Sequence, residues 1–214
     1  MKKYGSILWI TILIVIIWFM TNNNTNKIFI DLTKSYPYSM GFVKFAILSI
    51  MGEFLATRII YKEWRMIKGV IPKMIIWGIL GVCIVLMFNL YTNGVIGAIN
   101  DGLLPSFNNS KFAIAIYIST IMNLTFGPVF MAAHRITDTI IDNIFNSTKI
   151  KPTQALSKID WNGFLSFVIL KTIPLFWIPA HTITFLMPSE YKVVFAASLS
   201  IVLGLILSFA KMRN

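Results

Sequence analysis

The sequence predicts an all-α polytopic membrane protein, a helix bundle of about six transmembrane helices with both termini cytoplasmic. Its 214 residues are 57% hydrophobic and only 13% charged, a composition that is unusual for a soluble domain. Basic residues fall on alternate connectors between the apolar stretches. Each apolar stretch is near the ~20 residues that cross ~30 Å of hydrocarbon. The six stretches are residues 4–20, 40–60, 74–99, 112–133, 164–187 and 193–210.

The distribution of basic residues predicts the orientation. Of the 19 Lys and Arg residues, 13 lie at the two termini or in the connectors after the second and fourth stretches. The positive-inside rule places these segments on the cytoplasmic side. Because the connectors are mostly short, we expect one integral membrane domain over residues 1–214. We expect a bacterial cell membrane as its location, with an organelle membrane as the alternative.

The net charge of +11 raises the possibility of nucleic-acid binding. The basic residues flank the apolar stretches, however, where anionic lipid head groups attract them. The expected partner is therefore the lipid bilayer and not a nucleic acid.

The first stretch follows Lys2 and Lys3, as in a secretory signal, but no small-x-small cleavage site comes after it, so an uncleaved span is expected. In the third stretch, Cys83 reads as a packing residue. His134 and His181 lie far apart in the sequence, so we expect neither a metal site nor a cofactor.

Two stretches carry faces of small residues, which let helix backbones approach closely in lipid. The second has such a face around Gly52. The sixth has one residue of this kind every fourth position, namely Ala196, Ser200, Gly204 and Ser208. This face is expected to pack within the chain or against a second copy or another membrane protein.

The fourth stretch has a polar stripe that includes Ser119 and Asn123 and is followed by Pro128. Beyond it, isoleucines recur at helical spacing in residues 135–146, which predicts that the span continues into an interfacial amphipathic helix.

Ionisable side chains inside a span need a partner, a cavity or a route to the interface. Lys44 lies near the outer end of the second span, so it can snorkel outward. Glu53 and Lys171 both fall ~10 Å below the inner boundary, which suggests an ion pair. That pair is either static or part of a cavity lining; an unpaired, snorkelling Lys171 is the third possibility, and Arg58 is another candidate partner for Glu53.

Pro174 and Pro179 interrupt the fifth span near Lys171 and His181. Freed carbonyls at membrane depth need protein or water as partners. The candidate residues of a narrow aqueous pathway are therefore Glu53, Lys171, Asn123, His181 and Ser119.

Three short motifs resemble the Mpv-seventeen and peroxisomal membrane protein family. The segment from Gly52 to Thr57 is similar to its Gly-Asp-x-x-x-Gln element, with Glu53 in place of Asp. Asn123 and Pro128 resemble its Asp-Gln-x-x-x-x-Pro segment. The C-terminal run of the family, with its Trp-Pro and Pro-x-x-Tyr-Arg elements, resembles Trp177, Pro188, Tyr191 and Lys192. The resemblance implies a small multi-pass membrane protein, with a pore-like role as proposed for some members.

The predicted function is a small channel or transporter-like protein for small solutes or ions. The alternative is a non-catalytic structural or accessory subunit of a membrane complex, as a homo-oligomer or with a partner protein. An enzyme is not expected, because no nucleophile, base and metal occur at a catalytic spacing.

Overall fold

The computed structural model describes residues 4–145 and 150–213, with side chains described as far as residue 206. This part of the chain is all-helical and contains no strand. Two elements are not α-helical: η1 is a 3-10 turn of three residues, and η2 is a π-helix of 14 residues. The elements are α1 (Gly5–Thr21), α2 (Asn23–Ser35), α3 (Pro37–Tyr61), α4 (Val70–Asn100), η1 (Phe107–Asn109), α5 (Lys111–Phe145), α6 (Pro152–Leu156), α7 (Trp161–Gly163), η2 (Phe164–Trp177), α8 (Ile178–Leu186) and α9 (Ser189–Arg213).

All six predicted stretches are helical, but they are not equally suited to cross a membrane. Within the described residues, four helices are long and apolar enough: α4, α5, the continuous helix Trp161–Leu186, and α9 as far as Ile206. A fifth candidate is the pair of α1 and α2, which is bent by 86°. The 25-residue α3 is not in this set. It carries Lys44, Glu53 and Arg58, and these charges lower its hydropathy.

The chain divides into two compact units, residues 1–82 with 197–214, and residues 83–196. Both α4 and α9 begin in one unit and end in the other. The single membrane domain predicted over residues 1–214 therefore remains a prediction.

In the first unit, glycines allow the helices to approach closely. A Cβ added at Gly81 of α4 would lie 2.5 Å from the carbonyl oxygen of Gly41 in α3, so only hydrogen fits there. The N-terminal helix is held by tryptophans. Trp9 of α1 donates to the Met51 carbonyl of α3 at 2.9 Å, and Trp64 donates to the Ser6 hydroxyl at 2.8 Å.

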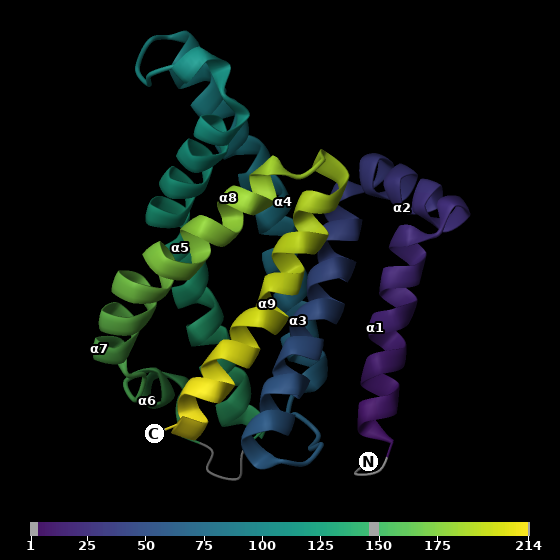
Figure 1. Ribbon diagram of the computed structural model, residues 1–214. Coiled ribbons are helices and arrows are strands. Elements are labelled where there is room, and N and C mark those ends of the chain that lie inside the picture. The colour runs from purple at the N-terminus through teal and green to yellow at the C-terminus, as the bar shows by residue number, and fades with distance from the viewer. Residues whose placement is uncertain (1–3, 146–149, 214) are drawn as a thin grey trace. The chain divides into compact units, whose positions relative to one another are not determined.

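The second helix of the first unit, α2, was not predicted. Residues 21–39 read as a connector because they are polar on average. Asn22 stands at the bend, where its side chain accepts the Asn24 N–H at 3.1 Å and so caps the new helix. Figure 1 shows α2 turning sharply away from α1.

Residues of α2 bury the Lys44 side chain. The Lys44 ammonium donates to the Thr33 hydroxyl at 2.8 Å and lies 4.3 Å from the centre of the Phe29 ring. Lys44 is only 6% exposed. Its side chain reaches toward α2 and is covered by protein there.

In the second unit, α5 is a single helix of 35 residues that contains Pro128. At 1.5 Å per residue it is about 52 Å long, well beyond the ~30 Å hydrocarbon thickness. Its last three turns cover residues 135–145 of the 135–146 segment that was expected to follow the fourth span as a helix. The antiparallel return is the helix Trp161–Leu186, whose α8 part packs along α5 (Figure 1).

Candidate functional site

Three of the polar residues that the sequence singles out meet in the second unit. Ser119 and Asn123 are four residues apart on α5 and therefore share one face of that helix. His181 is in the first turn of α8, which packs on α5. The three residues are 0%, 3% and 7% exposed. A buried polar cluster of this kind must satisfy its own hydrogen bonds.

The hydrogen bonds form a directed chain. The Asn123 side-chain Nδ2 donates to the Ser119 carbonyl at 2.8 Å and lies 3.3 Å from the Ser119 hydroxyl. Asn123 Oδ1 lies 3.0 Å from His181 Nδ1. The Ser119 hydroxyl in turn donates to the Ile178 carbonyl at 2.7 Å, which ties α5 to the start of α8.

This chain assigns the tautomer of His181. A backbone carbonyl only accepts, so the Asn123 atom facing Ser119 must be the amide nitrogen and the atom facing His181 must be the oxygen. His181 Nδ1 therefore carries a hydrogen and donates. In the neutral imidazole, the lone pair is then on Nε2. This nitrogen makes no hydrogen bond to any described residue.

Aromatic rings enclose the imidazole. The Trp177 indole stacks on it, with ring centres 5.3 Å apart and planes 25° from parallel. The Phe88 ring meets it edge-on at 5.9 Å. Trp177 Nε1 is buried and has no hydrogen-bond partner in the described part of the chain. The cluster thus has one acceptor, His181 Nε2, and one donor, Trp177 Nε1, that the described residues leave unsatisfied.

The backbone beside the cluster departs from an α-helix. From Phe164 to Trp177 the helix has the wider turns of a π-helix, and the Ile178 N–H bonds the Ile173 carbonyl five residues back. Pro174 and Pro179 interrupt the α-helical ladder here because proline has no N–H. The Ile178 carbonyl accepts from two side-chain hydroxyls, those of Ser119 and Thr182. Such wide turns are rare in proteins and occur frequently at functional sites.

Glu53 lies in the first unit and has partners there. Trp77 Nε1 donates to one carboxylate oxygen at 2.8 Å, and the Lys73 ammonium lies 3.7 Å from the other. Lys73 is buried in the first turn of α4, although the sequence suggested a connector charge. Lys171 belongs to the second unit and its side chain is exposed. The expected Glu53–Lys171 pair therefore stays a prediction.

The small-residue faces of α3 and α9 meet within the first unit. A Cβ added at Gly52 would lie 3.0 Å from the Ser200 carbonyl oxygen, and one at Gly204 would lie 3.2 Å from the Gly52 carbonyl oxygen. Ser200 also donates to the Leu48 carbonyl at 3.4 Å. Ala196 is buried. The side chain of Ser208 lies outside the described residues.

The residues that carry the family resemblance are only partly brought together. Asn123 and Trp177 both contact His181, whereas Glu53 lies in the other unit. Pro188 marks the break between α8 and α9, where the Tyr191 N–H bonds its carbonyl at 3.0 Å. Comparison with protein-family models, curated proteins and solved structures finds no match to this chain. The resemblance therefore stays a hypothesis.

Several partners were missed by sequence reasoning. The sequence has no pattern that indicates Phe88 or the Ile178 carbonyl, because only tertiary packing brings them to the cluster. Lys73 and Trp77 are four residues apart and share a helix face, a spacing that could have suggested them as partners for one acidic side chain. No group of three or more His, Cys, Asp and Glu side chains suited to a metal ion occurs among the described residues.

Proposed function

We propose that the chain is a multi-pass integral membrane protein of about six spans, with both termini in the cytoplasm, that passes small solutes or ions. The polar cluster of Ser119, Asn123 and His181 lies on the proposed path. The proposed family is that of the Mpv-seventeen and peroxisomal membrane proteins.

The exposed apolar surface supports the membrane setting. None of the residues of α1 is buried. Ile7, Leu8, Ile14 and Trp18 are each more than half exposed. Soluble monomers rarely expose contiguous apolar surface of this extent, while in a bilayer the lipid chains cover it. With α3 counted as a span despite its charges, the helices α1, α3, α4, α5, Trp161–Leu186 and α9 make six.

The observation that carries the transport proposal is the buried Trp177 Nε1, a donor without a hydrogen-bond partner among the described residues, in the indole that stacks on His181. In a purely structural network the Trp177 Nε1 would have a partner, because a buried donor left unsatisfied costs about 1–3 kcal/mol. His181 Nε2 can accept a hydrogen bond and Trp177 Nε1 can donate one. A small polar solute, a water molecule or a hydrated ion that passes the wide helix η2 would find both groups.

The accessory-subunit alternative has less support. The feature that favours this alternative is the small-residue face of α9, which could bind a second membrane protein. Ser200 and Gly204 already pack on Gly52 within the first unit. A partner would have to bind elsewhere on the surface.

Reconstitution into liposomes tests the proposal. Three probes cover the solute classes: protons with an internal pH dye, potassium with an internal fluorescent indicator, and glycerol by light scattering. We expect flux of at least one probe above that of empty liposomes, and altered flux in Glu53→Gln and Lys171→Met. Absence of flux for all three probes, and for a wider set of ions and metabolites, would overturn the proposal.

A further inference from the structure

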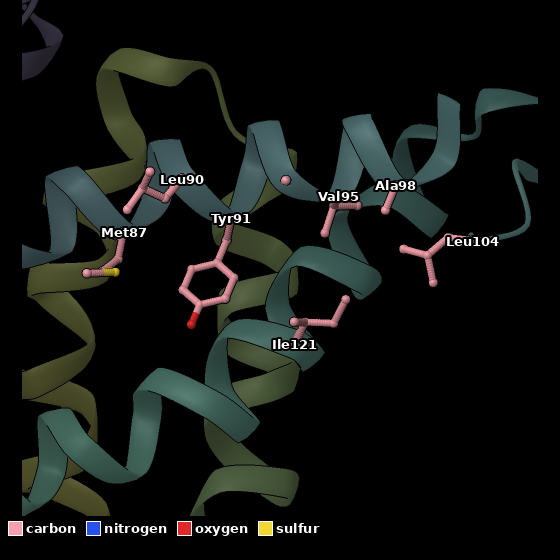
Figure 2. Close-up of a pocket in the computed structure, with 8 residues that line it drawn as sticks. Met87, Leu90, Tyr91, Val95, Ala98, Leu104 and Ile121 are labelled. Atoms are coloured by element: carbon pink, nitrogen blue, oxygen red, sulfur yellow. The ribbon is translucent and has the colours of Figure 1, made fainter. Parts of the chain in front are cut away.

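We propose that the second unit holds an acyl-chain site, a groove along α4 that takes one hydrocarbon chain of an outer-leaflet lipid. The groove has a volume of about 360 Å³. It is bordered by α4, by Ile121 of α5 and by Leu104 of the connector, as Figure 2 shows. The inference rests on the proposed membrane orientation but not on solute transport.

The lining has no group that would bind a polar ligand. It consists of side chains such as Met87, Val95, Ala98 and Ile121, with Gly94 between them. Tyr91 has the only hydroxyl in the lining, and its oxygen lies 2.7 Å from the Thr125 hydroxyl. Because the Thr125 hydroxyl donates to the Ile121 carbonyl, the Tyr91 hydrogen is used in their bond, and the lining offers no free donor and almost entirely van der Waals contact. A hydrocarbon is the ligand class that this surface suits.

The length and depth of the groove match one leaflet. From Met87 to Ala98 the lining extends along α4 for about 16 Å at 1.5 Å per residue. That is about half of the ~30 Å hydrocarbon thickness. In the proposed orientation, Asn100 ends α4 on the outer side, so the groove runs from the outer head-group boundary to the bilayer centre. An outer-leaflet acyl chain runs in this direction over this depth.

Two glycines of α4 supply a matched pair of variants. A Cβ at Gly94 or at Gly97 would meet no other heavy atom within 4 Å, so a side chain at either position starts into open space. Gly94 lines the groove and Gly97 does not. Gly94→Phe fills the groove, and Gly97→Phe adds the same ring outside it. Gly94→Leu is a smaller second variant, should Gly94→Phe fold poorly.

The test uses phosphatidylcholine with a photoactivatable diazirine in the middle of one acyl chain, added to the outer leaflet of liposomes that contain the purified full chain. After irradiation, mass spectrometry maps the labelled peptides. We expect labelling concentrated on residues 87–98, reduced about tenfold by Gly94→Phe, or by Gly94→Leu, and unchanged by Gly97→Phe. A tenfold loss of occupancy corresponds to about 1.4 kcal/mol.

Three outcomes would overturn the acyl-chain site. The first is even labelling along all apolar helices, which indicates ordinary boundary lipid. The second is equal labelling of the Gly94 and Gly97 variants. The third is cross-linking of residues 87–98 to a second copy of the chain. If only lipid in the inner leaflet labelled these residues, the proposed orientation would be refuted instead. If labelling were as expected but no solute flux were found, only the transport proposal would be refuted.

Discussion

The bond between Asn123 and His181 can be tested by a double-mutant cycle. Asn123→Leu removes the Oδ1 acceptor while keeping the same branched arrangement of side-chain heavy atoms, and leaves the buried Nδ1–H of His181 without a partner. His181→Phe does the converse and leaves Asn123 Oδ1 unsatisfied. Each single variant should lose about 1–3 kcal/mol of unfolding free energy, the cost of an unsatisfied buried group. The double variant leaves neither group behind.

The expected coupling is about 1 kcal/mol, because hydrogen bonds between membrane helices contribute about 0.6 kcal/mol on average and at most about 1.7. The double variant should therefore be more stable than the sum of the single losses predicts. Titration with a denaturing detergent in mixed micelles measures the free energy, with helicity as the signal. Tryptophan fluorescence is a second signal, since Trp177 stacks on His181.

A control cycle uses Asn93 as its first site instead of Asn123. Asn93 is exposed on α4, and its side chain donates to the Asn89 side chain. Asn93→Leu with His181→Phe should be additive within the ~0.3–0.5 kcal/mol seen for independent sites. The reasoning about the cluster would be refuted if the Asn123 cycle were equally additive.

Two further predictions concern the first unit. Gly81→Ala should destabilise the protein by about 1–3 kcal/mol, because its new Cβ would lie 2.5 Å from the Gly41 carbonyl oxygen. The control variant Gly97→Ala should not destabilise the protein in this way, because open space surrounds a Cβ at that position. Unfolding of both variants in denaturing detergent compares their stabilities. Lys44→Met should speed hydrogen exchange in α2, since the Lys44 ammonium bonds Thr33 there; unchanged exchange over residues 23–35 would show that this contact does not hold α2.

The elements with a strong local signal could be predicted from the sequence. Long apolar runs gave the helices α4, α5 and α9, and the four-residue spacing placed Ser119 and Asn123 on one face. His181 was noted as a residue near a broken helix, but its bond to Asn123 depends on how α8 packs on α5. That register follows from tertiary packing, which a single sequence does not display.

The elements that sequence reasoning missed depend on local capping and on partners distant in sequence. The helix α2 begins where Asn22 caps it, inside a segment whose average polarity suggested a connector. For Glu53, depth in the predicted membrane suggested Lys171, and it did not suggest Lys73 and Trp77, which contact Glu53 within the first unit. Residues at the same depth below the membrane boundary can belong to any of the helices, so equal depth does not show which helices are neighbours.

Flux through the double variant Asn123→Leu with His181→Phe tests the central claim most directly. This variant removes the Asn123–His181 bond without leaving either partner group behind, and its loss of stability should be about 1 kcal/mol smaller than the sum of the two single losses. With folding verified by circular dichroism, we expect flux of the conducted probe in liposomes to fall about tenfold, equivalent to a barrier increase of about 1.4 kcal/mol. Flux equal to that of the unaltered protein would show that the cluster is structural and that the path, if present, lies elsewhere.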